Sequence, residues 1–244
     1  MSNSYTILSK YYDEFSSQDC DYVRWSQYLL SKAKLHNVKT AVDVACGTGK
    51  MTELLCQAGL SVTATDASSQ MLNVASGKCK ATFVLQDMRK LQILRKTDMV
   101  TCVNDGVNYL KPDELYPFFV RVADSLNDGA PFVFDISSQY KLTEILGNNV
   151  FYDDGDSATL LWTNKLSSRS VTMDITLFEN QNGLYRRFDE SHVQYIHKQF
   201  EVEQALKQAG FAVAEVTADY GLPLKPTSQR ITFYAVKKCG AATE

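Results

Sequence analysis

The sequence lacks the features that would assign it to a membrane or secreted class. No apolar run in its 244 residues approaches the roughly 20 residues that a membrane-spanning helix needs. The stretch from Met1 to Tyr5 has neither the basic start nor the apolar core of a signal peptide. Internal repeats and low-complexity stretches are also missing. We therefore expect a cytoplasmic protein that has no membrane partner.

Metal-binding and strongly charged patterns are missing as well. The six cysteines stand at positions 20, 46, 56, 79, 102 and 239, without a CxxC pair and without compact spacing to the three histidines. A zinc site needs such a cluster, and scattered thiols suit a reducing compartment. The net charge of -3 argues against a partner held by phosphate neutralisation. We predict no metal and no nucleic-acid partner, and we make no prediction of the oligomeric state.

What the sequence does have is an alternation of short apolar strands and helices. The first forty residues have helical spacing, and strands are then expected at 40–45, 60–66, 81–85, 98–103 and 130–136. Helices follow most of them, and Ser68 is a candidate N-cap. Such alternation predicts a doubly wound α/β fold with a parallel, Rossmann-like sheet.

A different pattern occupies residues 151–195. Three extended segments, 159–163, 170–178 and 185–195, are joined by turn residues and predict an inserted three-stranded antiparallel sheet. A helix at 201–208 and strands at 211–218 and 230–236 return to the first pattern. We therefore expect one α/β domain, made of residues 1–150 with its N-terminal helical cover and residues 196–244. The insert would form a lid on the acceptor side.

The sharpest motif is a glycine turn after the first strand. A dinucleotide-binding GxGxxG would need glycine at 45, 47 and 50, where this chain has Ala45, Gly47 and Lys50. The broken motif disfavours a nicotinamide oxidoreductase, and a phosphate-binding P-loop is absent too. Asp43 would repel a phosphate but suits the cationic, amino-acid end of a sulfonium cofactor.

Two further polar groups stand at the ends of successive strands. Asp66 ends the second strand, where it could accept hydrogen bonds from both ribose hydroxyls. Gln86, Asp87 and Met88 follow the third strand, where Asp87 could accept from an adenine amine and Met88 could pack on its face. Ligands bind at carboxyl ends of strands in open α/β sheets, so these signals indicate one site.

These motifs resemble those of the class I S-adenosylmethionine-dependent methyltransferases: DVACGTG at 43–49, TDAS at 65–68 and QDM at 86–88. Residues 5–15, 105–110, 134–141 and 190–195 further resemble a group of small bacterial methyltransferases of mostly unassigned substrate. The chain departs from that group at Ala45, where glycine is common, and at Gly106, where serine is usual.

The resemblance implies that S-adenosylmethionine is the cofactor and S-adenosylhomocysteine the product. Its methionine part would lie near the glycine turn, its ribose at Asp66 and its adenine at Asp87 and Met88. The aromatic residues Tyr11, Tyr12 and Trp25 would cover it, or form only the apolar face of two helices. The predicted cofactor site comprises Asp43, Ala45, Cys46, Gly47, Thr48, Gly49, Asp66, Ala67, Gln86, Asp87, Met88, Asn104, Tyr12 and Trp25.

A general base is needed only if the acceptor arrives protonated. His192 is the first candidate, with Glu190 on the same face of the strand, although both could instead belong to a solvent-facing polar strip. His36 and His197 are expected at the surface. Acceptor contacts are predicted for Asn108, Tyr140 and Tyr195.

Several acceptors remain open. The tetrapeptide [DNS]PP[YFW] and the dipeptide Pro-Cys, used on nucleic-acid bases, are absent. We therefore predict a methyltransferase for a small molecule. The alternatives are a methyltransferase for RNA or protein, and a non-catalytic module that senses the cofactor.

Overall fold

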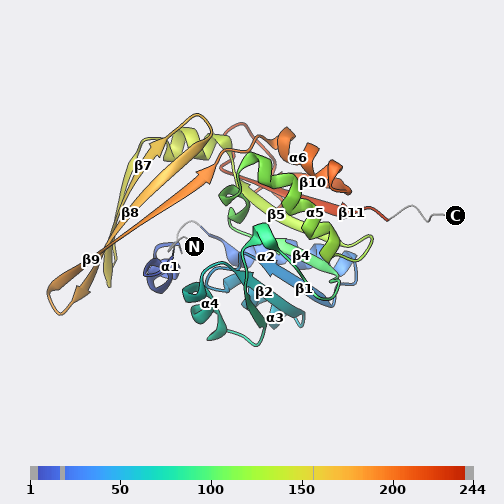
Figure 1. The fold of residues 1–244 in the computed structure, drawn as a ribbon, viewed down its shortest axis with the longest axis horizontal. Coiled ribbons are helices and arrows are strands. Elements are labelled where there is room, and N and C mark those ends of the chain that lie inside the picture. Colours follow the sequence, from blue (N-terminus) through green and yellow to red (C-terminus); the bar gives the residue numbers. More distant parts are fainter. Residues whose placement is uncertain (1–4, 17–19, 156, 240–244) are drawn as a thin grey trace.

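The computed structural model describes residues 5–16, 20–155 and 157–239, which form an α/β fold built on a seven-stranded sheet (Figure 1). Its strand order is β10-β11-β5-β4-β1-β2-β3, and β11 runs antiparallel to both of its neighbours. The strands are β1 (Thr40–Val44), β2 (Ser61–Asp66), β3 (Thr82–Leu85), β4 (Met99–Cys102), β5 (Pro131–Ser137), β10 (Phe211–Ala218) and β11 (Arg230–Lys237).

Helices cover both faces of this sheet, as the doubly wound prediction requires. In β5, Phe132 and Phe134 pack with α5 and α6, whereas Val133 between them packs with α2 and α3. Successive strand residues point to opposite faces, so each strand contributes to two cores. The helices are α1 (Leu8–Ser16), α2 (Tyr22–Leu35), α3 (Lys50–Gln57), α4 (Ser69–Ser76), α5 (Leu115–Ser125) and α6 (Gln199–Gln208). In the described part of the chain, none of them is long and apolar enough to cross a membrane.

The inserted sheet is antiparallel but has four strands, so the prediction of three was wrong. It consists of β6 (Val150–Asp154), β7 (Ala158–Leu166), β8 (Ser170–Gln181) and β9 (Leu184–Tyr195), in that order. The strand that was missed, β6, is a half-exposed edge strand that ends in two aspartates. Its sequence therefore has little apolar signal, and its pairing with β7 makes it a strand.

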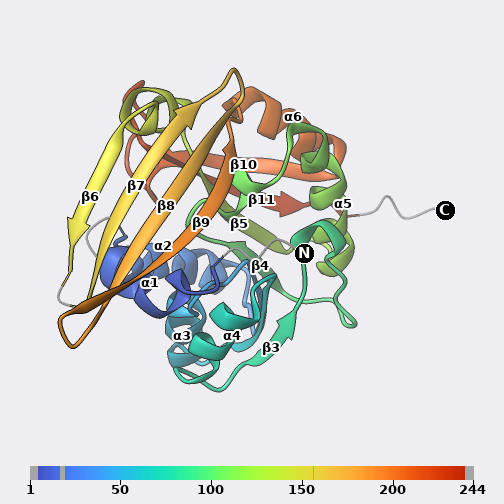
Figure 2. The same cartoon turned by 60° about the vertical axis from the view of Figure 1, so that its left-hand side comes forward.

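Helix α1 lies against this second sheet, which extends over it in both views (Figures 1 and 2). Leu8 and Tyr11 share a small apolar core with Leu160 of β7 and Leu177 of β8. The first helix thus packs against the insert, although some 150 residues separate them in the chain.

A short 3-10 helix, η2 (Gly106–Tyr109), joins the two sheets through the buried side chain of Asn108. Its Oδ1 accepts from the Ser137 N–H at 2.8 Å, and its Nδ2 donates to the Tyr195 carbonyl at 3.0 Å. Ser137 ends β5 and Tyr195 ends β9, so one amide holds the insert at a fixed position on the main sheet.

Replacing this amide should weaken the joint. We expect Asn108→Ala to lower the free energy of unfolding by about 1–3 kcal/mol, because it leaves buried backbone groups without partners. Urea unfolding measures the change. Asn73→Ala, at an exposed position of α4, is the control and should stay within about 0.5 kcal/mol of the wild type. Equal stabilities of the two variants would contradict the role of Asn108.

Candidate active site

A cavity of about 580 Å³ opens at the carboxyl ends of β1, β2 and β4. Most of the predicted cofactor residues line it: Tyr12, Asp43, Ala45, Cys46, Gly47, Thr48, Asp66, Ala67, Gln86, Asp87, Met88 and Asn104. The cavity is also lined by residues outside the predicted cofactor set: Tyr5, Tyr22, Met51, Ser68, Met71, Leu85, Arg89, Val103, Asp105, Gly106 and Tyr109. Tyr5 and Tyr109 lie in the segments that carried the resemblance, but nothing in one sequence showed that they meet.

The glycine turn between β1 and α3 supplies the floor of the cavity. Gly47 and Gly49 have φ of 55° and 78°, in the left-handed region that favours glycine. A Cβ at Gly49 would lie 2.7 Å from the Cβ of Ala75, so this glycine permits α3 and α4 to approach each other. Gly49 itself does not line the cavity. Its role is to place the start of α3.

Asp43 is buried beneath the turn. Its carboxylate accepts from Thr52 Oγ1 at 2.6 Å and from Thr101 Oγ1 at 2.8 Å. Burial raises the pKa of Asp43 to about 6, although the two hydroxyl groups favour the charged form. A carboxylate in such a position gains from a cationic ligand that restores its charge balance.

Asp66 and Asp87 lie in the wall of the cavity. Asp66 accepts from the Gly47 N–H at 2.9 Å and the Ser68 N–H at 2.8 Å, while burial raises its pKa. Ser68 caps α4, as predicted, by accepting from the Met71 N–H. Asp87 is more exposed and accepts from the Arg89 N–H at 2.8 Å. Both carboxylates therefore face the cavity from fixed turns.

The N-terminal segment closes the cavity from above. Tyr5, Tyr12 and Tyr22 line it, and Thr48 of the glycine turn donates to Asp13 of α1 at 2.6 Å. Lys78 donates to the other oxygen of Asp13 at 2.5 Å. This contact ties α1 directly to the floor of the cavity.

Glu190 and His192 hold the other end of α1. Glu190 accepts from the backbone N–H groups of Tyr5, Ile7 and Leu8 at 2.7, 2.9 and 3.2 Å. Burial opposes its ionisation, but His192 and these N–H groups outweigh burial and lower the pKa of Glu190. His192 is 3% exposed, its ring lies 4.4 Å from that of Tyr5, and its Nε2 lies 3.3 Å from Glu190 Oε2. Neither residue lines the cavity.

Two expectations about histidines were wrong. The alternative of a solvent-facing strip at 190–192 does not hold, because His192 is buried against Tyr5. His197 is also buried, and burial lowers its pKa to about 4. His36 pairs with Tyr234, its Nε2 lying 2.6 Å from the hydroxyl oxygen. Isolated histidines gave no pattern from which these partners could be predicted.

Four other predicted residues lie outside the cavity lining. Trp25 of α2 points into the core, where its ring stacks on that of Tyr220 and its Nε1 donates to Asp219 at 2.9 Å. Asn108 serves the joint between the sheets, to which Tyr195 contributes its carbonyl. Tyr140 directly precedes a π-helix (Lys141–Leu146). The spacing of aromatic residues on a helix could not tell the face towards the core from the face towards a ligand.

Comparison with known proteins identifies the family. The sequence model of a protein family described as a methyltransferase domain matches residues 41–129. A protein from Geobacillus sp. that is named as a methyltransferase is 31% identical to this chain, over 96% of this chain and 100% of its own length. A crystal structure of an S-adenosylmethionine-dependent methyltransferase from Clostridium acetobutylicum is 33% identical, covers 96% of this chain and 99% of its own, and has a TM-score of 0.88. The chain is an S-adenosylmethionine-dependent methyltransferase.

Other relatives of the methyltransferase agree with this assignment. A Bacillus subtilis protein, also named as a methyltransferase, is 31% identical over 96% of this chain and 97% of its own. The sugar N-methyltransferase KedS8 of Streptoalloteichus shares the fold, with a TM-score of 0.79 at 20% identity over 93% of each chain. The predictions of family and fold class are therefore confirmed, and the oxidoreductase reading is excluded.

The two positions at which the methyltransferase departs from its group, Ala45 and Gly106, lie next to each other. Ala45 has a φ of 53°, and its Cβ lies 3.1 Å from where a Cβ at Gly106 would be. The Sγ of Cys102 lies 2.9 Å from the same point. The methyl group of Ala45 therefore occupies space that a side chain at position 106 would need.

We expect Gly106→Ala to destabilise the protein by about 1–3 kcal/mol through overpacking. Ala45→Gly should recover part of this loss in the double variant, because it removes one contact and relieves a left-handed alanine. A double-mutant cycle in urea measures the coupling. Gly77→Ala is the control, since this residue has a φ of -77° and only an ordinary contact at 3.5 Å. Strict additivity would contradict the contact.

The raised pKa of Asp43 predicts a pH dependence of the cofactor-free protein. The stabilisation by protonated Asp43 is full below about pH 4 and is lost as the pH rises through about 6. A pKa shift of this size changes the free energy of unfolding by about 3 kcal/mol between the two ends of the range. Asp43→Asn should keep that stabilisation and be the more stable protein at pH 8.

Urea unfolding of both proteins at pH 4 and pH 8 makes the comparison. The exposed Asp124 gives the control variant, Asp124→Asn, whose difference from the wild type should change less with pH than that of Asp43→Asn. A pH-independent difference for Asp43→Asn would show that folding does not change the pKa of Asp43.

Proposed function

We propose that the enzyme transfers the methyl group of S-adenosylmethionine to a small-molecule acceptor. The main support for this proposal is that α1 and the residues before it lie over the cavity. Asp13 ties α1 to the glycine turn, and Glu190 of the inserted sheet binds the backbone N–H of Tyr5. An acceptor that reacts beneath such a cover has to be compact. A long RNA or protein segment would require this cover to open.

The cofactor fits the residues of the cavity floor. We assign its cationic amino group to the side of Asp43, its ribose hydroxyls to Asp66, and its adenine to Gln86, Asp87 and Met88. Asp66 has a raised pKa because it is buried, so donors from a ribose would stabilise its charge. The sulfonium cofactor supplies an activated methyl group when bound, and the chain supplies alignment and exclusion of water.

Two further arguments support a small acceptor. The net charge of -3 does not favour the phosphate backbone of RNA. Several proteins with this fold act on small molecules, among them the sugar N-methyltransferase named above and an amino pentose methyltransferase from Micromonospora echinaspora. We further propose a cytoplasmic location, because all six thiols are unpaired.

The first test is Asp66→Ala. We expect its affinity for S-adenosylmethionine to fall by about 1–3 kcal/mol, because charge-assisted hydrogen bonds to the ribose are lost. Calorimetric titration with S-adenosylmethionine, S-adenosylhomocysteine and NADH measures this, with Asp124→Ala as the matched control. Wild-type affinity in a folded Asp66→Ala protein would refute the position assigned to the ribose.

The acceptor class is tested separately by release of S-adenosylhomocysteine. Fractions of a bacterial extract, divided into metabolites below about 1 kDa, RNA and protein, serve as acceptors. Activity in the small-molecule fraction is expected. Activity that follows only the RNA or the protein fraction would overturn the proposed acceptor and leave the cofactor assignment intact.

A further inference from the structure

Asp105 lies in the cavity wall, but the assignment of the cofactor gives it no role. It follows β4 in a turn where both Asn104 and Asp105 are left-handed, with φ of 65° and 53°. Two successive non-glycine residues in this region are unfavourable unless their surroundings hold them there. The turn directs Asp105 to the end of the cavity that is closed by the N-terminal segment.

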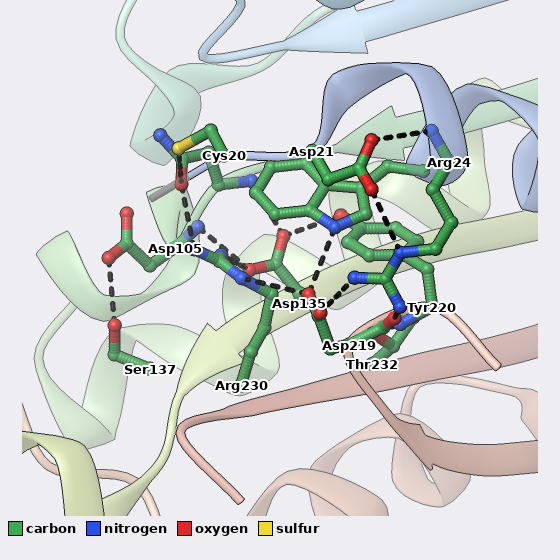
Figure 3. Close-up of polar contacts among 12 residues, drawn as sticks. Cys20, Asp21, Arg24, Asp105, Asp135, Ser137, Asp219, Tyr220, Arg230 and Thr232 are labelled. Atoms are coloured by element: carbon green, nitrogen blue, oxygen red, sulfur yellow. Dashed lines mark hydrogen bonds and ion pairs between the residues drawn. The ribbon is translucent and has the colours of Figure 1, made fainter. Parts of the chain in front are cut away.

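A buried carboxylate holds this turn. Asp135 Oδ1 accepts from the Asn104 N–H at 2.6 Å, and its Oδ2 accepts from the Asp105 N–H at 3.1 Å. Asp135 is held in turn by an ion pair with Arg230 and by the Tyr220 hydroxyl at 2.7 Å (Figure 3). The left-handed turn is therefore held in place by buried hydrogen bonds and a buried ion pair.

The same network leaves the charge of Asp105 available to the cavity. Arg230 pairs with Asp135 and Asp219, and Arg24 pairs with Asp21 and Asp219, so two guanidinium groups already face three carboxylates. Asp105 is an additional negative group beside them. Ser137 Oγ donates to Asp105 Oδ2 at 2.8 Å and fixes the rotation of its carboxylate (Figure 3).

Four tyrosines surround the same end of the cavity. Tyr5 and Tyr109 are joined by their hydroxyl groups, and Asn104 Nδ2 donates to the hydroxyl oxygens of Tyr12 and Tyr22 at 3.0 and 3.4 Å. Burial raises the pKa of all four, and the charge of Asp105 adds to the effect. The rings are therefore neutral near pH 7 and present electron-rich faces.

Positive side chains are scarce here. Among the described residues that line the cavity, Arg89 alone is basic, and it pairs with Asp87 and Glu114. A carboxylate among aromatic rings, with no free guanidinium or ammonium group, attracts a cation and disfavours an anion.

We propose that this end of the cavity is an acceptor subsite for a compact amine, with Asp105 as the catalytic residue that binds its ammonium group. The inference rests on the proposed function and narrows its substrate class to amines. Alcohols lack the charge that Asp105 would pair with, and carboxylates or phosphates would be repelled by it.

The reaction at this subsite balances as follows. The ammonium group of the acceptor transfers one proton to Asp105, which frees the nitrogen lone pair. The nitrogen forms a bond to the methyl carbon while the carbon–sulfur bond breaks, and that electron pair goes to sulfur. The products are a methylated ammonium ion, neutral thioether S-adenosylhomocysteine and protonated Asp105, which then returns its proton to solvent.

Three probes that share a tert-butyl group test the subsite: tert-butylammonium, tert-butanol and pivalate. Each is titrated into the protein saturated with S-adenosylhomocysteine, and binding is followed by saturation transfer from protein to the single methyl resonance of the probe. We expect the ammonium ion to bind at least tenfold more tightly than the alcohol, and pivalate to bind most weakly.

Asp105→Asn should remove this preference while it changes the affinity for S-adenosylhomocysteine less than threefold. Asp124→Asn, the exposed control, should retain the preference. Equal binding of the three probes to the wild type would overturn the amine subsite without the use of any variant, and so would a preference that persists in Asp105→Asn. If the wild type does not bind S-adenosylhomocysteine at all, the proposed function itself fails and the inference with it.

Discussion

The buried pair of Asp135 and Arg230 holds the turn that places Asp105 in the wall of the cavity. Asp135 is fully buried on β5, Arg230 is 7% exposed on β11, and their contact crosses two adjacent antiparallel strands. A buried carboxylate without a partner is strongly unfavourable, and removing one member of such a pair generally costs about 3–5 kcal/mol. Because the same carboxylate accepts the N–H groups of Asn104 and Asp105, the charge balance of the core and the shape of the cavity depend on each other.

A second constraint connects the cofactor floor with the inserted sheet through α1. Asp13 near its centre binds Thr48 of the glycine turn, while its first turn is capped by Glu190 of β9. A carboxylate at a helix N-terminus satisfies N–H groups that have no partner within the helix and interacts favourably with its dipole. Contacts made by the insert therefore help to position the segment that carries Tyr5 and Tyr12 in the cavity wall, although the insert does not itself line the cavity.

Most residues of the predicted cofactor site line the cavity because the signals that identified them are local. Asp43, Gly47, Asp66 and Asp87 each stand where one strand passes into its turn, and parallel strands bring those turns to one edge. The surroundings of Glu190, His192 and Asp105 lacked such signals. His192 and Glu190 had the residue types of an acid–base pair, but their pairing with Tyr5 and the backbone of α1 depends on contacts across some 180 residues. The position of Asp105 after the fourth strand was a weak signal of a ligand contact, and only the structure showed the turn that holds it.

The sequence by itself determined the family, the doubly wound order of strands and helices, and the position of the glycine turn, because apolar periodicity and the conformational freedom of glycine act over a few residues. The tertiary structure alone decided which face of each helix meets the cavity, the pairing of β6 as a fourth strand, and the surroundings of Asp105, His192 and Trp25. These outcomes depend on packing and burial between distant segments, and burial determines whether a polar side chain faces a ligand, a helix end or another charge.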